Sequence, residues 1–265
     1  MVLTGASGLL GTWLRRTVPD GIDLVGVVHR RAPEGIRHVD ADLRDEAATR
    51  AAIGAVRPDL VIHAAYRLDA PSIVAATRHV TATARDADAH LVFVSSDAVF
   101  AGDGLPRAED AVPDPPHDYG RWKAEAETLV AGLGRRSTIV RLPLLVSLDP
   151  PDHVLARIRQ GAATRTPTIW FDDELRQPAS AAEVAAALWR IVGLDRADRS
   201  GVWHLPGPEL LSRFAIAQRA VARLGLETSA IVAAPTPAGV VRPRSLVLEG
   251  GRAAESVDWS PSPIP

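Results

Sequence analysis

The sequence predicts an α/β fold built on a doubly wound parallel sheet, with a smaller C-terminal lobe interleaved with that sheet. Short apolar runs rich in β-branched residues follow one another with amphipathic stretches between them in the first half of the 265-residue chain. Within each run apolar and polar residues do not alternate, which is typical of strands buried on both faces. Strands that alternate with helices form βαβ units, and their right-handed crossovers place helices on both faces of one sheet.

The expected elements follow the chain in order. The expected strands are Met1–Thr4, Leu24–His29, Leu60–His63, Leu91–Ser95 and Ser137–Leu142, with another strand just before Asp40. The expected helices are Leu9–Thr17, Glu46–Val56, Ala70–Ala87 and Tyr119–Leu133. The less regular second half contains expected helices at Asp152–Gln160 and Ala181–Val192, a short strand at Gly201–Leu205 and an amphipathic stretch at Leu211–Leu224.

The composition excludes several classes of protein. Hydrophobic residues make up 46% and charged residues 23% of the chain, as in globular proteins. The chain has no cysteine, which excludes disulfides, thiolate metal sites and cysteine nucleophiles. A net charge of −2 does not favour a nucleic-acid partner, and no apolar run reaches the ~20 residues of a membrane span. The first residues lack the basic segment of a signal peptide, so we expect a cytoplasmic protein.

A glycine-rich turn opens the chain. Gly5, Gly8 and Gly11 are spaced G-x-x-G-x-x-G between the first expected strand and the first expected helix. Glycine permits the tight turn, and the free N–H groups at the start of the helix can bind a pyrophosphate. This context predicts a dinucleotide-binding site, although glycine-rich turns also occur without any ligand.

The end of the second expected strand indicates which dinucleotide binds. An acid about 20 residues after the glycine motif usually receives the ribose hydroxyls of NAD, whereas Arg accommodates the 2′-phosphate of NADP. Here the strand ends in His29, Arg30 and Arg31, which favours NADP; a solvated basic turn is the alternative. Asp42, followed by Leu43, can accept a hydrogen bond from the adenine amino group or cap the next helix.

The residues expected to carry out chemistry include the only lysine of the chain. Tyr119 and Lys123 stand four residues apart, so they share one helix face, and the chain has only one other tyrosine. An ammonium near a phenol stabilises phenolate and lowers a pKa of ~10, which makes the tyrosine a usable general acid. The alternative is an exposed lysine next to a packed tyrosine.

Two serines stand at the end of the expected strand Leu91–Ser95. Ser95 and Ser96 lie at its C-terminal end, the position where open α/β sheets bind ligands. We expect Ser96 to donate a hydrogen bond to the substrate oxygen and Ser95 to face the cofactor; the alternative is a pair of turn-capping hydroxyls. Asp97 can orient or protonate the substrate or simply cap the turn. Of the strand-end residues His63, Ala64 and Ala65, the small alanines allow a close cofactor approach, and His63 has a structural role.

Several motifs together resemble those of a known family. TGASGLLG, SSDAVF and YGRWK resemble the extended short-chain dehydrogenase/reductases. Asp173–Pro178, Gly201–Leu205, Leu211–Phe214 and Arg242–Pro243 are similar to segments of dTDP-4-dehydrorhamnose reductases and related sugar-nucleotide-binding proteins. The chain departs from that group at Ala98, where the group has Tyr, and at His63, where it has Asn.

The resemblance implies a Rossmann domain, NADPH as hydride donor and a nucleotide-linked 4-keto sugar as substrate. It implies that Ser96, Tyr119 and Lys123 are the catalytic triad. The residues expected to contact NADP(H) are Gly5, Ser7, Gly8, Leu9, Leu10, Gly11, His29, Arg30, Arg31, Asp42, Leu43, His63, Ala64, Ala65, Tyr66, Ser95, Tyr119, Lys123 and Pro143. The substrate is expected to contact Ser96, Asp97 and Arg176, with no metal involved.

We therefore expect an NADPH-dependent ketoreductase of deoxysugar biosynthesis, in which residues 1–145 bind the dinucleotide. Residues 146–265 would mainly bind a small-molecule substrate, with segments near 181–205 returning to the sheet. Two alternatives stay open: an NAD(P)-dependent epimerase or dehydratase of sugar nucleotides, and a non-catalytic NADP-binding regulatory subunit. The arginine pair argues against NAD, and a lysine at the catalytic spacing argues against a regulatory subunit. The oligomeric state also stays open, with a homodimer as one outcome.

Overall fold

A seven-stranded parallel sheet forms the centre of the molecule, in a computed structural model that describes residues 1–30 and 33–264. Its strand order is β12-β7-β5-β4-β1-β2-β3, and neighbouring strands in it are parallel. The strands are β1 (Val2–Thr4), β2 (Val25–Val28), β3 (His38–Asp40), β4 (Leu60–His63), β5 (His90–Ser96), β7 (Ser137–Leu142) and β12 (Gly201–His204). The order reverses direction at β1, which confirms the expected doubly wound sheet.

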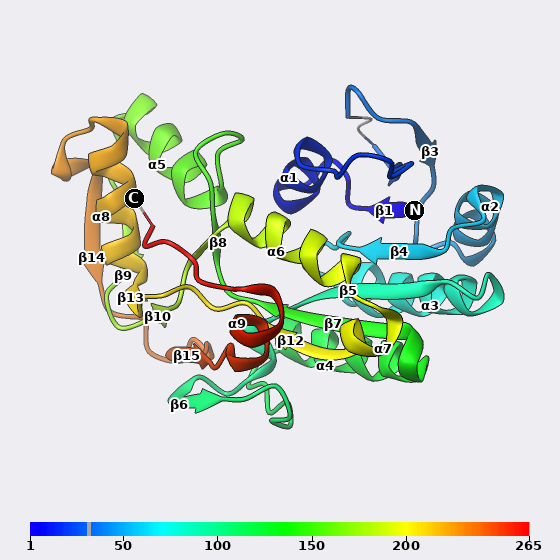
Figure 1. The fold of residues 1–265 in the computed structure, drawn as a ribbon. Helices are drawn as coiled ribbons and strands as arrows, with labels where there is room; N and C mark the ends of the chain where they lie inside the picture. Colours follow the sequence, from blue (N-terminus) through cyan, green and yellow to red (C-terminus); the bar gives the residue numbers. More distant parts are fainter. Residues whose placement is uncertain (31–32, 265) are drawn as a thin grey trace.

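Helices cover both faces of this sheet (Figure 1). One face is covered by α1 (Leu9–Arg16), α6 (Ala181–Gly193) and α9 (Gly251–Val257), whose apolar residues share one core with the sheet. The other face is covered by α2 (Glu46–Val56), α3 (Ala76–Asp86) and α4 (Asp118–Ala131), which share a second core. A π-helical turn, η1 (Pro71–Ala75), leads into α3, and the short α7 (Arg196–Arg199) leads into β12.

A second lobe lies beyond the C-terminal ends of the strands (Figure 1). Its apolar core joins α5 (His153–Ala163) and α8 (Arg213–Leu224) to the parallel pair β9 (Thr168–Phe171) and β14 (Ile231–Ala234). A four-stranded sheet contains β13 (Leu211–Ser212), β10 (Leu175–Arg176), β15 (Ser245–Leu248) and β6 (Asp103–Arg107). The pair β8 (Leu145–Val146) and β11 (Ala179–Ser180) connects this lobe to the central sheet.

The two halves of the chain are interleaved. β12 pairs with β7 at the edge of the central sheet, and α6 packs on α1. In the other direction, β6 of the first half pairs with β15 of the second. Neither β6 nor α9 is expected from the sequence, because β6 reads Asp-Gly-Leu-Pro-Arg and α9 begins with glycine. Each obtains its stability from partners that are distant along the chain.

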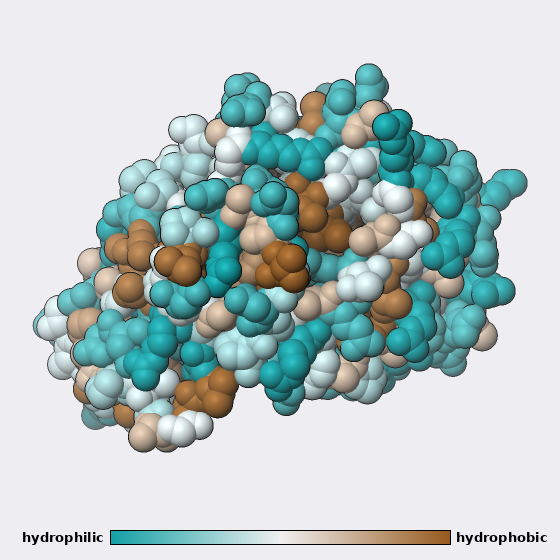
Figure 2. All heavy atoms as spheres, turned by 90° about the horizontal axis from the view of Figure 1, so that it is seen from below, coloured by the Kyte–Doolittle hydropathy of each residue, from teal (hydrophilic) through white to brown (hydrophobic). Residues whose placement is uncertain are grey.

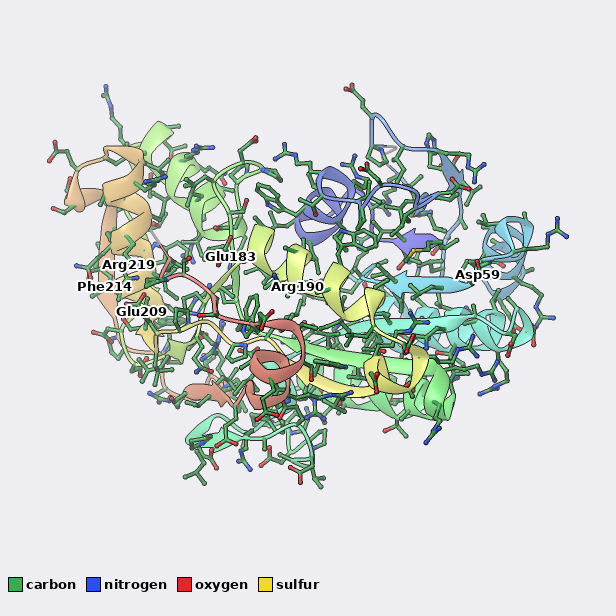
Figure 3. The ribbon with its side chains drawn as sticks, in the orientation of Figure 1. Asp59, Glu183, Arg190, Glu209, Phe214 and Arg219 are labelled. Atoms are coloured by element: carbon green, nitrogen blue, oxygen red, sulfur yellow. The ribbon has the colours of Figure 1, made fainter. Side chains whose placement is uncertain are left out.

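The last residues cross the molecule from α9 toward α8. The indole nitrogen of Trp259 donates to the carbonyl of Pro206 at 2.9 Å, and the Ser262 amide donates to Glu183. Arg219 forms a two-fold ion pair with Glu209 and also donates to the Ile264 carbonyl at 2.9 Å. Figure 3 shows Glu183 on α6 and Arg219 on α8, on either side of this segment. Through these hydrogen bonds the C-terminal segment connects α8 of the lobe to α6 of the central sheet domain.

Hydrophilic side chains cover most of the face seen in Figure 2, with apolar groups in separate patches. The exposed large apolar side chains include Leu105, Val112, Val240 and Val241. Within the part of the chain that the structure describes, no helix has the length and apolar character needed to cross a membrane.

Candidate active site

One cleft of about 980 Å³ lies at the C-terminal edge of the central sheet and continues into the second lobe. It joins the strand-end residues of the sheet to residues of β10, α8 and the segment before β15. The expected site residues that line it are Gly5, Ser7, Gly8, Leu9, Leu10, Gly11, His29, Arg30, Asp42, Leu43, Ala64, Ala65, Tyr66, Ser95, Ser96, Asp97, Tyr119, Lys123, Pro143 and Arg176. Arg31 lies outside the described residues, and His63 does not line the cleft.

The glycine motif folds into a tight turn at the start of α1. Gly5 has φ +74°, and a Cβ there would lie 2.7 Å from the Ala65 nitrogen. The Gly8 amide donates to the Gly5 carbonyl at 2.9 Å, and α1 begins at Leu9. At Gly11 a Cβ would lie only 2.2 Å from the Gly5 carbonyl oxygen. The glycines therefore let helix, turn and the strand end after β4 approach one another, and a pyrophosphate fits the N–H groups of the first helical turn.

We expect Gly11→Ala to lower the free energy of unfolding by about 2 kcal/mol, since the new methyl group meets a backbone oxygen that cannot move alone. The same change should weaken dinucleotide binding because the turn must open. Gly54→Ala is the matched control: it lies in α2, where a Cβ meets nothing within 4 Å, and alanine should stabilise the helix by about 0.5–1 kcal/mol. Urea unfolding of both variants measures the difference. Equal stability of the two variants would contradict the close-approach role of Gly11.

Asp42 lines the cleft near His29 and is hydrogen-bonded to a neighbouring arginine. Arg44 donates to Asp42 through Nη2 at 2.5 Å and through Nε at 2.9 Å, and His29 Nε2 lies 3.8 Å from Oδ2. These hydrogen bonds from Arg44 hold the pKa of Asp42 well below its usual range. Asp45, not Asp42, caps α2 by accepting from the Ala48 amide. Arg44 also lines the cleft and is not among the residues expected from the sequence.

His63 is buried next to the glycine turn and contacts Thr4, the residue that precedes it. Its Nδ1 is 2.7 Å from the Thr4 hydroxyl and its Nε2 is 3.1 Å from that of Thr77. Thr4 in turn accepts from the Ala65 amide at 3.2 Å. Burial and the charge of Lys123 lower the pKa of His63 to about 3, so the ring is neutral. His63 does not line the cleft, and both of its ring nitrogens lie within hydrogen-bond distance of hydroxyl groups inside the protein.

Tyr119 lies in the first turn of α4, close to the end of β5. His117 caps this helix, accepting from the Gly120 amide at 3.4 Å. A Cβ at Gly120 would lie 2.2 Å from the Ala98 carbonyl oxygen, so glycine brings the start of α4 against the segment that follows Ser96. Burial and the neighbouring Tyr66 raise the pKa of Tyr119, and a hydrogen bond with the Ser96 hydroxyl opposes the rise. The phenol is therefore protonated at neutral pH.

Lys123 lies one turn further along α4 and is buried. Its Nζ donates to the Val94 carbonyl at 2.8 Å. Burial lowers the pKa of Lys123 to about 7, opposed by the nearby charge of Glu127. The expected lowering of the Tyr119 pKa by Lys123 is not found in this arrangement, where burial of the phenol has the larger effect.

Ser95 lines the cleft, but its hydroxyl points toward α4. Its hydroxyl donates to Glu127 Oε1 at 2.5 Å, and Arg141 of β7 pairs with the same carboxylate at 2.8 Å. Successive side chains of a strand point to opposite sides, so Ser96 is the residue whose hydroxyl lies beside Tyr119 and Asp97. Ser96 donates to Asp97 Oδ1 at 3.0 Å. The buried network of Ser95, Glu127 and Arg141 fixes α4 against the sheet.

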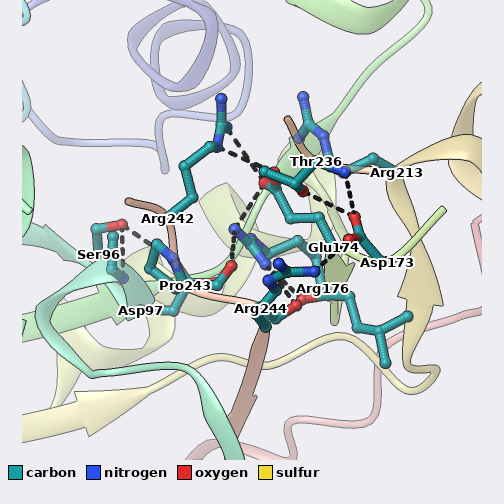
Figure 4. Close-up of polar contacts among 12 residues, drawn as sticks. Ser96, Asp97, Asp173, Glu174, Arg176, Arg213, Thr236, Arg242, Pro243 and Arg244 are labelled. Carbon is teal, nitrogen blue, oxygen red and sulfur yellow. Dashed lines mark hydrogen bonds and ion pairs between the residues drawn. The ribbon is translucent and has the colours of Figure 1, made fainter. Parts of the chain in front are cut away.

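Arginines converge at the far end of the cleft (Figure 4). Arg176 donates to Glu174 Oε1 at 2.6 Å and to the Pro243 carbonyl at 3.0 Å, and Arg242 Nε lies 3.0 Å from Glu174 Oε2. Burial raises the pKa of Asp97, and the charge of Arg176 opposes this rise. Arg213 donates to His153 Nε2 at 3.0 Å, and burial lowers its pKa to about 10, so it stays charged at neutral pH.

The Arg176 Nη groups are already bonded to Glu174 and to backbone carbonyls, whereas Arg213 and Arg242 have N–H donors beyond those that bond to His153 and Glu174, which suits an anionic ligand. Arg176 is the member expected from the sequence. Arg213 and Arg242 line the same cleft from α8 and from the segment before β15. Arg213 and Arg242 lie in the segments Leu211–Phe214 and Arg242–Pro243, which resemble segments of sugar-nucleotide-binding proteins. That resemblance does not indicate where the two side chains point.

Comparison with known proteins decides the family. The sequence model described as the RmlD substrate binding domain matches residues 1–263. The chain belongs to this family. The resemblance stated from the sequence is thereby confirmed, as is membership of the NAD(P)-dependent oxidoreductases of the extended short-chain kind.

Some relatives of this RmlD family member are named as sugar-nucleotide reductases, and others are named as a subunit of methionine adenosyltransferase. The dTDP-4-keto-6-deoxy-D-glucose reductase of Streptomyces niveus is 28% identical over 263 residues, which cover 93% of this chain and 87% of the relative. Methionine adenosyltransferase 2 subunit beta of Xenopus laevis is 27% identical over 244 residues, covering 82% of this chain and 69% of the relative. A crystal structure of a hypothetical dTDP-4-dehydrorhamnose reductase from Sulfolobus tokodaii has a TM-score of 0.85 at 24% identity, covering 100% and 97% of the two chains.

Proposed function

We propose that this protein is an NADPH-dependent reductase of a nucleotide-linked 4-keto sugar. The observation that carries the proposal is that one cleft joins the glycine turn, the groups Ser96, Tyr119 and Lys123, and the arginines of the second lobe. The first set suits a dinucleotide, the second suits proton transfer to a carbonyl, and the third suits a diphosphate. Residues 1–145 would bind the dinucleotide, and residues 146–265 mainly the substrate, with segments near 181–205 in the central sheet domain.

The glycine turn fits the cofactor because Gly5 and Gly11 let the turn pack closely against neighbouring backbone, while the residues at the start of α1 line the cleft with their N–H groups available. When bound, NADPH supplies the hydride that is added to the carbonyl carbon. Ser96 would donate a hydrogen bond to the carbonyl oxygen and orient it toward Tyr119. Tyr119 would give its phenolic proton to the same oxygen as charge develops there and would recover a proton from solvent. The ammonium of Lys123 would stabilise the phenolate that is left.

The substrate class rests on the far end of the cleft. Arg176, Arg213 and Arg242 would pair with the diphosphate of a nucleotide sugar, whose charged oxygens accept from guanidinium groups. This binding would place the sugar ring between the arginines and Tyr119. Ala98, which replaces the tyrosine of similar reductases, leaves more room beside Asp97, so the sugar that fits need not be the one that those reductases use.

We expect Arg30→Ala to weaken NADPH binding about tenfold and NADH binding less than twofold, since only NADPH carries the 2′-phosphate. Arg30 lines the adenosine end of the cleft, so its loss removes a charge-assisted contact to that phosphate. Titration of both cofactors by fluorescence measures the ratio. Arg37→Ala is the control, because Arg37 is exposed and pairs with Asp23 outside the cleft. Equal weakening of both cofactors would contradict the 2′-phosphate role.

The test of the function itself is NADPH consumption by the purified protein with a panel of nucleotide-linked 4-keto sugars, with cofactor binding measured in parallel. Consumption of NADPH with formation of the hydroxy sugar is the expected result. Isomerised or dehydrated sugar without net consumption would instead indicate an epimerase or dehydratase. Binding of NADPH without any turnover across the panel would refute the reductase proposal.

A regulatory subunit is the second candidate, favoured by the relatives named methionine adenosyltransferase 2 subunit beta. A protein of this kind would bind NADP in the same cleft and act by assembling with another chain. The distinguishing experiment is size-exclusion chromatography of the protein mixed with a methionine adenosyltransferase, with NADP present. Co-elution together with an absence of ketone reduction would support the subunit and exclude the reductase.

A further inference from the structure

The ammonium of Lys123 lies between two aromatic rings. Nζ is 4.9 Å from the ring centre of Tyr66 and 4.8 Å from that of Phe93. Phe93 is part of β5 and is fully buried, whereas Tyr66 follows β4 and is 53% exposed. Phe93 comes from the middle of β5 and Tyr66 from the segment after β4, and the lysine reaches both rings from α4. Both rings are within the distance at which the negative face of an aromatic ring attracts a cation.

Ordinary hydrogen bonding does not satisfy this ammonium. An ammonium has three N–H donors, and within the described residues the Lys123 Nζ donates only to the Val94 carbonyl. Lys123 is nevertheless only 3% exposed. A charge buried with a single hydrogen bond needs another source of stabilisation, and the two ring faces are the groups that are placed to give it.

Tyr66 is the member of this arrangement that structural packing does not explain. Half of its surface is open to the cleft, so little apolar burial depends on its identity. Its ring lies 6.0 Å from that of Tyr119 at an interplanar angle of 42°. One side chain at the mouth of the cleft therefore contacts both members of the Tyr119 and Lys123 pair.

We propose that Tyr66 is a positioning residue, whose ring face, together with Phe93, holds the Lys123 ammonium in the charged form beside Tyr119. This role rests on the proposed reductase for its purpose, because in that proposal a charged Lys123 stabilises the phenolate that is left when Tyr119 gives up its proton. It acts through Lys123 and needs no contact between Tyr66 and the substrate. The contact itself is independent of the reaction and can be measured without it.

The other charged and titratable groups around Lys123 are already paired or are neutral, so they do little to keep its ammonium charged. Glu127, on the same helix, favours the charged form, but its carboxylate is already paired with Arg141 of β7. His63 of β4 is neutral and adds no charge. Phe93 and the Val94 carbonyl are the groups from β5. With burial lowering the pKa of Lys123 to about 7, a contribution from one ring decides how much of the ammonium is charged at neutral pH.

The titration of Lys123 can be observed without overlap from other lysines, because Lys123 is the only lysine of the chain. Protein labelled with 13C at lysine Cε gives a single resonance, and its titration by NMR reports the pKa of Lys123 without any assignment. The variants are Tyr66→Leu, which keeps an apolar side chain over the ammonium but removes the ring, and Tyr66→Phe, which keeps the ring and removes only the hydroxyl. Tyr66→Met is a second ring-free variant, in case leucine disturbs the loop.

We expect the pKa of Lys123 to fall by about one unit in Tyr66→Leu and Tyr66→Met and to stay within a few tenths of the parent in Tyr66→Phe. An unchanged pKa in both ring-free variants, with thermal stability preserved, would overturn the proposal. An equal fall in Tyr66→Phe would also overturn it, since the hydroxyl and not the ring would then be responsible. Such a result would leave the proposed reaction untouched.

The activity assay provides the separate readout. If the protein reduces a ketone, the pH at which kcat/KM falls on the alkaline side should move to lower pH in Tyr66→Leu by the same shift as the lysine titration, and Tyr66→Phe should restore it. A lysine shift without an activity shift would reject the positioning role while leaving the reductase in place. Absence of turnover in the unmodified protein would count against the reductase, and the NMR result would still decide the contact.

Discussion

Tyr119→Phe should lower kcat/KM for ketone reduction about a thousandfold while NADPH binding stays within about twofold. The change deletes one oxygen and keeps the ring, so its packing against Tyr66 and His117 is preserved. What is lost is the proton donor beside Ser96. Without it the alkoxide formed by hydride addition has no acid in contact with it, and the barrier rises by the free energy that a positioned general acid contributes.

The measurement is steady-state NADPH oxidation together with cofactor titration for the parent and the variant. Arg121→Ala is the control, because Arg121 is on the exposed side of the same helix and pairs with Asp118. It should leave both activity and binding unchanged. A Tyr119→Phe variant that keeps its activity would move proton delivery to another group. Asp97 is the next candidate, since it accepts from Ser96 and burial raises its pKa.

Most of the central sheet could be predicted from the sequence, because strands buried on both faces consist of nearly uninterrupted apolar residues. β5, with His90–Ser96 almost wholly buried, is the clearest case. The elements that the sequence does not reveal are those without an apolar pattern of their own. β6 contains Gly104 and Pro106 and becomes a strand only because β15, far along the chain, lies beside it. Such a strand has no local pattern from which to infer it.

The candidate site likewise contains residues whose placement the sequence predicts and residues whose placement it does not. Spacing within one helix or one turn predicts that Tyr119 and Lys123 share a face and that Gly5 and Gly11 surround a turn, and the structure brings these residues to one cleft. The direction of Ser95, the hydrogen bonds of His63 and the arrival of Arg213 from α8 depend on contacts between distant segments. A strand buried on both faces gives no alternation that would indicate which of two serines faces the ligand.

The largest pH-dependent effect is expected at Lys123. Its pKa is about 7 in the folded protein and about 10.5 in the unfolded chain, so between these values the unfolded chain binds one proton more. Stability therefore rises with pH across this window, by at most about 1.4 kcal/mol per pH unit from this group. Below pH 7 both states are charged, and the full cost of burying the ammonium remains.

Lys123→Met should remove this dependence. Methionine fills similar space without a charge, so the variant should be more stable than the parent at pH 6 by about 2 kcal/mol, after the lost hydrogen bond to Val94 and the ring contacts are subtracted. The difference should shrink above pH 7, vanish at about pH 8.5 and favour the parent at pH 9.5, because the parent gains about 1.4 kcal/mol per pH unit in this window. Urea unfolding between pH 6 and 9.5 measures it, below the range in which tyrosine ionisation adds its own contribution.

The same variant should reduce ketones at least a hundredfold more slowly, since the phenolate of Tyr119 loses its neighbouring charge. Gain of stability with loss of activity would show that Lys123 is retained at a cost to folding. That cost is hard to explain for a packing residue, because a chain with 30 basic residues places its only lysine where burial disfavours the charge. A Lys123→Met variant no more stable than the parent would mean that the rings of Tyr66 and Phe93 and the Val94 carbonyl fully compensate the buried charge, and the argument from cost would fail.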